Sequence, residues 1–238
     1  MGAARQAISA AELEHLFFAR DFALDILRRF FVEEPSQEYV KAFIQGKMPD
    51  LFPFNEDSEG ISEGLSLIKR YLEKNDPVNS RSDFENLHWD YTRMFLGPFE
   101  IPVEPWESVY VRKDNLLFQK TTMDVRKLYQ KYGYETAELN IEPDDHIGIE
   151  LDFLYRLNRL CIDSCRSERA SHEISYLVSE QLRFHKGHLA VFAPKIAAKM
   201  AAHSETDFYK GLAKLLEHYL VIDSKVLTEL LNIDILPN

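Results

Sequence analysis

Apolar residues recur at helical spacing through almost the whole of this 238-residue chain. Alternating, strand-like runs bounded by turn pairs are hard to find, so the pattern predicts an all-α protein. Capping signals mark the first long helix: Ser9 and Glu12 form a capping-box pair before the apolar run, which stops at Pro35. We expect residues 1–238 to form one domain of about nine or ten helices.

Glycine, proline and capping residues divide the chain into the predicted helices. These cover roughly residues 9–33, 36–46, 61–74, 82–96, 119–132, 143–165, 170–185, 187–202, 204–221 and 223–232. Residues 48–60 and 97–110 are predicted loops. The segment 134–142 joins two predicted helices, so it is a candidate hinge between two lobes. Such a hinge allows a domain-swapped dimer as well as a monomer.

Composition and charge limit the class of protein. With 45% hydrophobic and 12% aromatic residues, the chain can bury a core. Charges interrupt every apolar window long enough to span a membrane, and the N-terminal sequence lacks the apolar core of a secretory signal, so we expect a cytoplasmic protein. The formal net charge of −11 disfavours nucleic-acid binding. The same charge would attract a basic peptide, although ordinary solubility also explains an acidic surface.

The two cysteines, Cys161 and Cys165, lie close together in a helical pattern. Side chains at this spacing share a helix face but lack the geometry that a disulfide prefers. A metal site built on the two thiolates would need further ligands, and the neighbouring sequence contains no other Cys or His. We therefore expect both cysteines to be buried packing residues.

The loop 97–110 is unusually rich in rigid and aromatic residues. It contains Pro98, Phe99, Pro102, Pro105, Trp106 and Tyr110. Proline limits the entropy that a loop loses on binding, and aromatic rings supply apolar area with few rotatable bonds. The loop is therefore either one wall of a peptide-binding groove or a cover whose rings plug the core, and the residues alone favour neither.

A second feature lies at the predicted start of the helix 143–165, where Pro143 suits the first turn. Four polar residues surround it: Glu142, Asp144, Asp145 and His146. Capping alone explains them, because carboxylates complement the positive end of a helix. The same group of carboxylates also suits a guanidinium, which donates planar, charge-assisted hydrogen bonds to carboxylate oxygens.

Enzyme signatures are missing from the sequence. There is no phosphate loop, dinucleotide fingerprint, nucleophile elbow or zinc-protease helix. Ser108 has no evident base partner in the sequence. His146 and Glu150 have a spacing that a metal pair can use, and His172, His185 and His188 form a second histidine group, but solvated or capping roles explain both. We expect no catalysis, no cofactor and no metal.

Three motifs occur in order within residues 91–146. The first is Tyr91-x-x-Met94-Phe95-x-Gly97-Pro98, the second Pro105-Trp106-x-Ser108-Val109-Tyr110, and the third Glu142-Pro143-x-Asp145-His146. In these motifs the chain resembles the TorD/DmsD/NarJ family of chaperones for molybdenum-containing oxidoreductases. The second motif looks most like the DmsD branch.

The resemblance implies a cytoplasmic chaperone that binds the twin-arginine signal peptide of a molybdopterin oxidoreductase catalytic subunit. Such a chaperone holds the subunit back from export until its cofactor is inserted. The resemblance and the acidic group together predict these peptide-binding residues: Met94, Phe95, Phe99, Trp106, Ser108, Tyr110, Glu142, Pro143, Asp144, Asp145 and His146. The apolar members would form the wall of the pocket and residues 142–146 its rim.

Two other functions stay open. One is a NarJ-like chaperone that grips its folded client during cofactor insertion. The other is a small helical metal-dependent hydrolase that uses Asp145, His146 and Glu150. The sequence does not identify the client. It contains no phosphate loop that would support binding of GTP or of the molybdenum cofactor.

Overall fold

The computed structural model describes residues 7–97, 100–111, 120–135, 143–167 and 169–236. Within these ranges the α-helices are α1 (Ala10–Val32), α2 (Gln37–Gln45), α3 (Met48–Leu51), α4 (Glu59–Lys74), α5 (Arg81–Tyr91), α6 (Glu107–Val111), α7 (Lys120–Lys131), α8 (Ile147–Ser164), α9 (Ala170–Phe184), α10 (Ala190–His203) and α11 (Asp207–Leu230). Two five-residue π-helical turns, η1 (Thr92–Leu96) and η2 (His185–Leu189), continue α5 and join α9 to α10. The prediction of an all-α fold is confirmed.

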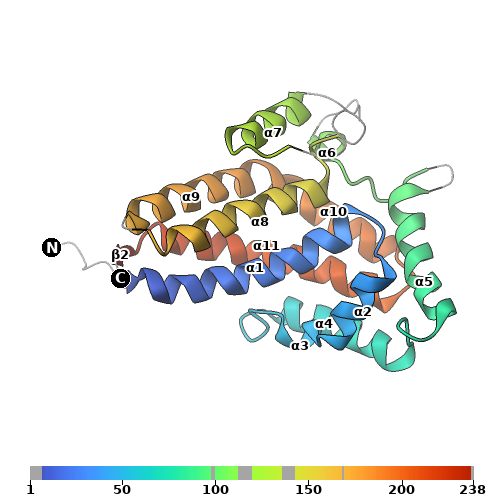
Figure 1. The fold of residues 1–238 in the computed structure, drawn as a ribbon. Helices are drawn as coiled ribbons and strands as arrows, with labels where there is room; N and C mark the ends of the chain where they lie inside the picture. The colour runs from blue at the N-terminus through green and yellow to red at the C-terminus, as the bar shows by residue number, and fades with distance from the viewer. Residues whose placement is uncertain (1–6, 98–99, 112–119, 136–142, 168, 237–238) are drawn as a thin grey trace.

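The long helices α1, α8, α9 and α11 lie side by side (Figure 1). Helix α1 packs along α8, and α11 packs against both α4 and α10. The chain ends lie at one end of this bundle, and α2 and α5 lie at the other (Figure 1). No helix in the described ranges is both long and apolar enough to cross a bilayer.

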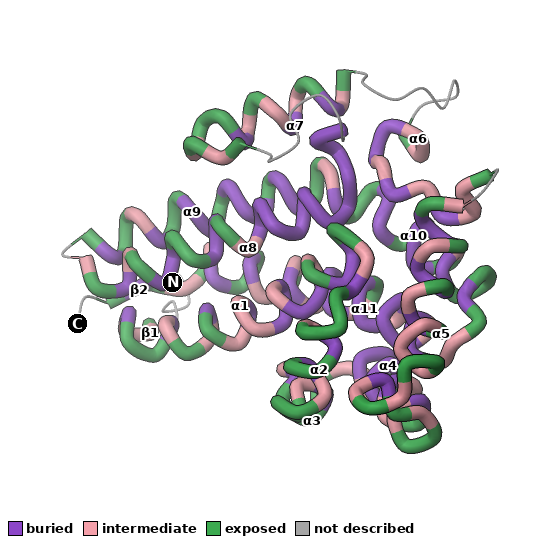
Figure 2. Tube along the Cα trace, turned by 45° about the vertical axis from the view of Figure 1, so that its right-hand side comes forward, coloured by how far each residue is buried: buried purple, intermediate pink, exposed green. Residues whose placement is uncertain are grey.

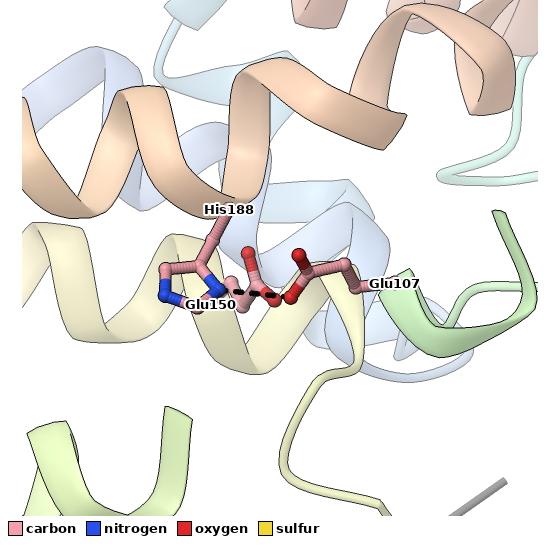
Figure 3. A group of neighbouring side chains, drawn as sticks. All are labelled: Glu107, Glu150 and His188. Atoms are coloured by element: carbon pink, nitrogen blue, oxygen red, sulfur yellow. Dashed lines mark hydrogen bonds and ion pairs between the residues drawn. The ribbon is translucent and has the colours of Figure 1, made fainter. Parts of the chain in front are cut away.

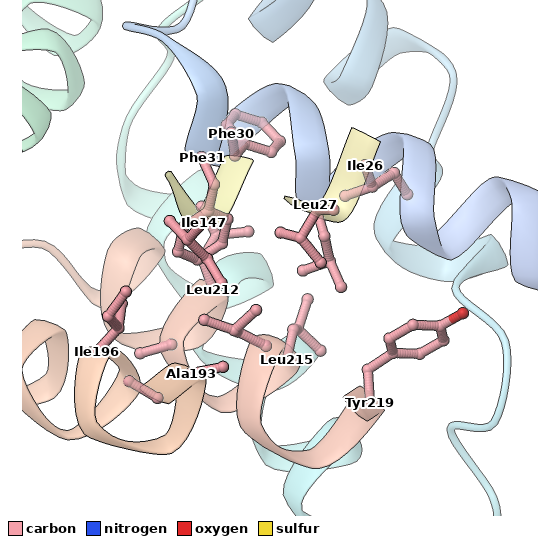
Figure 4. Close-up of a cluster of buried hydrophobic side chains, with 14 of the residues drawn as sticks. Ile26, Leu27, Phe30, Phe31, Ile147, Ala193, Ile196, Leu212, Leu215 and Tyr219 are labelled. Atoms are coloured by element: carbon pink, nitrogen blue, oxygen red, sulfur yellow. The ribbon is translucent and has the colours of Figure 1, made fainter. Parts of the chain in front are cut away.

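The main core fills the space between α1, α8, α10 and α11 (Figure 4). Phe30 anchors it through edge-on contacts with Phe43 and Phe208, whose ring centroids lie 5.0 and 5.3 Å away. Such tilted pairs are favourable beyond the apolar area that they bury. The tube view shows the same burial along the inner sides of α8 and α11 (Figure 2). The core therefore fixes the end of α1 against the start of α8.

A second cluster of buried residues closes the bundle near the chain ends. There β1 (Ala7–Ser9) pairs in parallel with β2 (Asp234–Leu236), a pair that is too short to give a periodic sequence signal. Ser9 also caps α1 and forms the predicted capping box with Glu12. Cys161 and Cys165 are buried here as predicted, and they form no disulfide with each other.

A buried ion pair links four helices. Arg20 of α1 is fully buried, and its guanidinium donates to Asp223 of α11 at 2.7 and 3.1 Å. It also donates to Asn158 of α8 at 2.7 Å and to Gln181 of α9 at 2.9 Å. Tyr219 completes the group by donating to Asp223. We call these residues the arginine network. Every charge in it has partners, as a buried ion pair requires.

Several predicted boundaries are wrong. The predicted break after residue 221 does not exist, because Asp223 faces Arg20 inside the bundle and α11 continues through it. The predicted break before Gly187 does not exist either, because the π-turn η2 joins α9 to α10 without a loop. The predicted loops contain the short helices α3 and α6. Helix α8 begins at Ile147 rather than Pro143, because the side chain of His146 caps it by accepting from the Gly148 amide. Most of the predicted hinge, residues 136–142, lies outside the described residues.

Candidate functional site

A pocket of about 500 Å³ opens where α1 ends and α8 begins. Its walls come from the end of α1, from α5 and η1, from the loop before α6, and from the cap of α8: Val32, Glu33, Glu34, Tyr91, Phe95, Leu96, Ile101, Pro105, Trp106 and His146. We call it the motif pocket, because each of the three sequence motifs contributes to it. Of the predicted site residues, it brings together Phe95, Trp106 and His146.

A close helix contact creates this pocket. Gly148, at the start of α8, lies against the end of α1, and a Cβ atom on it would be 2.3 Å from the Cα of Val32. Only glycine allows the two backbones to come this close. The contact places the last residues of α1 next to His146, so Glu33 and Glu34 line the same pocket as the third motif.

Backbone hydrogen bonds join the second motif to the third. The Ile147 amide donates to the Pro105 carbonyl at 2.8 Å, and the Glu107 amide donates to the Asp145 carbonyl at 2.9 Å. The ring of Trp106 then lies edge-on to the ring of His146, with centroids 6.4 Å apart. This bridge holds Trp106 in the pocket wall while leaving it partly exposed.

The first motif contributes through the π-turn η1. The Gly97 amide donates to the Thr92 carbonyl at 2.8 Å, and Gly97 has a φ of +52°. A Cβ atom there would be 2.2 Å from the Glu100 carbonyl oxygen, so the turn requires glycine. Within the turn Phe95 is buried against Tyr91, with ring centroids 4.8 Å apart, whereas Leu96 is 53% exposed. π-helical turns of this kind are frequent at functional sites.

The acidic residues before α8 already have partners within the chain. Asp145 is fully buried and accepts from the Ser108 amide at 2.8 Å and from the Thr122 hydroxyl at 2.9 Å. Asp144 is 1% exposed and pairs with Arg126 of α7. Burial lowers the pKa of His146 to about 4, which keeps its ring neutral at pH 7. Binding of a guanidinium to these residues stays a prediction.

The remaining predicted residues lie elsewhere. Met94 and Ser108 are buried in the protein, at 1% and 0% exposure. Tyr110 packs against Phe192 and donates to the Glu104 carbonyl at 2.8 Å, so it faces α10. Pro143 is also buried. Phe99 and Glu142 lie outside the described residues.

Comparison with known proteins gives the family. A sequence model described as "Nitrate reductase delta subunit" matches residues 54–198, which is more than half of the chain and includes all three motifs. The chain belongs to this family. The resemblance to TorD, DmsD and NarJ proteins is thus confirmed for the family as a whole.

Individual relatives in the family are named chaperones. The "Chaperone protein TorD" of Aliivibrio fischeri is 32% identical over 67% of this chain and 73% of its own length. That of Aliivibrio salmonicida is 28% identical over 84% of this chain and 91% of its own length. The "Tat proofreading chaperone DmsD" of Salmonella typhi is 23% identical over 82% of this chain and 85% of its own length. Relatives of both names match, so assignment to the DmsD branch stays a prediction.

Two acidic residues that line the pocket of this family member were not predicted as site residues. Glu33 is exposed at the C-terminal end of α1, and Glu34 accepts from the Thr92 hydroxyl while lying near His88. A helix carries partial negative charge at its C-terminal end, so these carboxylates and the helix dipole act in the same direction. In the sequence, Glu33-Glu34-Pro35 indicated only the end of a helix, although two adjacent acids at that end were a usable signal for a cation site.

A second group of polar residues lies beside the motif pocket. Glu107 of α6, Glu150 of α8 and His188 of η2 point toward one another (Figure 3), and their possible ligand atoms lie within 4.8 Å of each other. His188 Nδ1 is 2.9 Å from Glu107 Oε2. Burial, with the neighbouring charges of Glu107 and Asp145, raises the pKa of Glu150 well above its usual value. We call these three residues the Glu–Glu–His cluster.

The structure does not favour the hydrolase alternative. Asp145 and His146 use their side chains in the internal hydrogen bonds described above, and they do not join Glu150 in a common site. The predicted histidine group also separates, since His172 is exposed on α9 and His185 is buried. Only His188 of that group reaches a carboxylate cluster within the described residues.

Proposed function

We propose that this protein is a cytoplasmic chaperone that binds the twin-arginine signal peptide of a molybdopterin oxidoreductase catalytic subunit and retains the subunit until its cofactor is inserted. The observation that carries the proposal is the motif pocket, which collects Phe95, Trp106 and His146 from three separate motifs. Family membership supports it, because relatives carry the names chaperone and Tat proofreading chaperone.

The pocket chemistry suits the apolar part of a leader peptide. Trp106, Leu96 and Ile101 present partly exposed apolar surface beside the buried ring of Phe95. Burial of such surface supplies affinity without requiring a particular side-chain sequence. The loop is held by the backbone bridge between Trp106 and His146, so little ordering is needed on binding.

Glu33 and Glu34 are the acidic groups that we assign to the arginine pair of the leader. They lie in the same pocket as Trp106, and the C-terminal end of α1 adds to their negative potential. A guanidinium can form two parallel hydrogen bonds with a carboxylate, which lysine cannot reproduce. The net charge of −11 would draw a basic leader toward the protein.

We assign Asp144 and Asp145 the role of holding neighbouring residues in position, rather than of contacting the peptide. Asp145 holds the amide of Ser108, two residues after Trp106, and Asp144 holds Arg126 of α7. Removing the Asp145 carboxylate would therefore change the loop, and removing the Asp144 carboxylate would release Arg126 of α7, before either changed any direct contact with the peptide. Direct contact at the rim, as the sequence predicted, is the alternative, and the stability and leader binding of Asp145→Asn together distinguish the two.

The test is calorimetric titration of the full chain with a synthetic twin-arginine leader and with the same peptide carrying Lys for both arginines. We expect micromolar or tighter binding that weakens on the exchange. Trp106→Ala should weaken binding at least roughly thirtyfold, as expected for a central aromatic contact. Glu33→Gln should weaken it roughly tenfold and reduce its dependence on salt.

Matched variants separate these effects from general damage. Trp89→Ala removes an exposed tryptophan of α5 that does not line the motif pocket, and Glu38→Gln removes an exposed acid of α2. Both should bind the leader like wild type. No binding to several different leaders, or equal losses in the matched variants, would contradict the proposal.

A further inference from the structure

The Glu–Glu–His cluster has the composition of a metal site. Glu107 begins α6, Glu150 lies in the first turn of α8, and His188 lies in the π-turn η2 (Figure 3). Two carboxylates with one imidazole form a donor set that zinc accepts. We propose that Glu107, Glu150 and His188 bind one divalent transition-metal ion, with Zn²⁺ as the preferred ion. This proposal of a metal site does not depend on the proposal that the motif pocket binds a leader peptide.

The side chain of Glu150 provides the independent observation. It is fully buried, and among the described residues neither Oε1 nor Oε2 has a hydrogen-bond partner outside the cluster, where its carboxyl group can only share a proton with Glu107. A buried carboxyl group with so little hydrogen bonding loses the free energy of hydration and regains only a small part of it. Glu150 points toward Glu107 and His188 (Figure 3), so the missing partner would lie inside the cluster. A cation there would satisfy both carboxylates.

Charge balance favours a divalent ion. Glu107 is 2% exposed, so the cluster contains two adjacent buried carboxyl groups and one imidazole. Two carboxylates with a neutral imidazole offset the charge of a divalent ion, and the site would then be neutral in a region where isolated charge is costly. A proton shared by the carboxyl groups offsets only half of that charge.

The geometry requires only a small adjustment. Zinc ligands at about 2.0–2.2 Å lie roughly 3.3–3.6 Å from each other at tetrahedral angles. The present distance of 2.9 Å from His188 Nδ1 to Glu107 Oε2 would lengthen slightly, and ligand atoms now up to 4.8 Å apart would close. The ring of His188 is held by stacking on Phe184, with centroids 5.0 Å apart and planes at 29°. Three protein ligands leave a fourth position for water.

An entry route exists beside His188. A small cavity of about 180 Å³ reaches it, lined by Leu128, Phe153, Phe184, Gly187 and other residues. The side chain of His188 is 15% exposed, whereas Glu107 and Glu150 lie behind it. The ion can therefore reach the cluster through local motion of the imidazole ring.

Metal binding would fix the position of α6. Glu107 follows Trp106 directly, and Glu150 and His188 belong to the packed helices α8 and η2. An ion bound by all three would join the end of the loop to the rigid bundle. The wall of the motif pocket would then be more ordered in the metal-bound protein.

The experiment uses the full chain after treatment with a chelator and removal of the chelator. Titration with Zn²⁺ should show one ion per chain, with a Kd of micromolar or below, and an increase in Tm with added Zn²⁺. Glu150→Gln and His188→Gln, which keep side-chain size, should each weaken Zn²⁺ binding at least tenfold and abolish the increase in Tm. Absence of stoichiometric Zn²⁺ binding by wild type would overturn the proposal.

Two controls make the result specific. The variant His172→Gln with Glu173→Gln removes a histidine and an acid from the surface of α9, and it should bind Zn²⁺ like wild type. Substitution of Co²⁺ should give the visible absorption of a tetrahedral site without a thiolate charge-transfer band. A thiolate band would assign the ion to Cys161 and Cys165 and overturn the proposal, as would unchanged binding by Glu150→Gln.

Discussion

The arginine network and the Glu–Glu–His cluster are both buried groups of charged and polar side chains, but they differ in how completely they are paired. Arg20 has four hydrogen bonds to Asp223, Asn158 and Gln181. In the cluster, neither oxygen of Glu150 has a partner among the described residues except the adjacent carboxyl group of Glu107, with which it can share a proton. Complete pairing is typical of a structural group, whereas incomplete pairing indicates a site that is prepared for something else.

The two groups also sit at different places in the fold. The arginine network crosses the middle of the bundle and links α1, α8, α9 and α11. The cluster lies where α6 meets α8 and η2, directly beside the loop that carries Trp106. The first group therefore holds the long helices together, and the second lies next to the surface where we propose that a peptide binds.

Breaking the arginine network should give the largest loss of stability. Arg20→Met leaves the Asp223 carboxylate buried without its cation, which should cost about 3–5 kcal/mol of unfolding free energy. Urea unfolding at pH 7 measures it. The double variant Arg20→Met with Asp223→Leu should recover most of the loss, because no unpaired charge remains.

A surface ion pair supplies the control for that prediction. Arg81 is 90% exposed and pairs with Glu85, so Arg81→Met should change stability by less than about 1 kcal/mol. If the double variant stayed as unstable as Arg20→Met, the network would contribute through its hydrogen-bond geometry rather than through charge pairing.

Mild acid should lower the unfolding free energy through His146 at the motif pocket, and not through the arginine network. Burial lowers the pKa of His146 to about 4, below its value in the unfolded chain, so the unfolded state binds the proton first as pH falls. Stability contributed by neutral His146 is full above about pH 6.5 and falls as pH drops toward 4. The loss should be about 2–3 kcal/mol between pH 7 and pH 4.5.

His146→Asn isolates this effect. Asparagine is a good helix cap, so the variant keeps an acceptor for the Gly148 amide but has no group that titrates in this range. The loss of unfolding free energy between pH 7 and pH 4.5 should therefore be about 2–3 kcal/mol larger for wild type than for the variant. Parallel pH dependence would show that His146 is not responsible.

Asp145→Asn tests whether the acids before α8 hold the loop or receive the peptide. The neutral amide weakens the hydrogen bonds from Ser108 and Thr122, which should cost about 1–2 kcal/mol of unfolding free energy. Asp124→Asn, on the more exposed side of α7, should cost less than about 0.5 kcal/mol. Unchanged stability with lost leader binding would instead support direct contact between Asp145 and the guanidinium, as the sequence predicted.

Local signals in the sequence predicted much of the fold. The capping box of Ser9 and Glu12 and the helix-ending Gly97 were sufficient to locate α1 and the end of η1. These features depend on residues a few positions apart, whose hydrogen bonds are local. The start of α8 was misplaced because Pro143 and the following acids are as suitable for a turn before a helix as for its first residues.

Contacts between distant residues could not be predicted in the same way. Arg20 is one of the charges that interrupt the apolar N-terminal segment, and only its distant partner Asp223 explains its burial. Glu107, Glu150 and His188 come from three separate elements, so no local spacing connects them. For the motif pocket, the motifs predicted Phe95, Trp106 and His146, while Glu33 and Glu34 enter it only through the close approach of α1 to Gly148.

The smallest expected effect has the opposite sign to the largest. In chelator-treated protein, Glu150→Gln removes one of two adjacent buried carboxyl groups, and the raised pKa of Glu150 means that its ionisation opposes folding at pH 7. The variant should therefore be as stable as wild type or more stable by up to about 1 kcal/mol, as urea unfolding would show. Added Zn²⁺ should reverse the order, because only wild type gains the free energy of binding. A loss in metal-free Glu150→Gln as large as that of Arg20→Met would mean that Glu150 is already fully paired, and the contrast between the two buried groups would then be wrong.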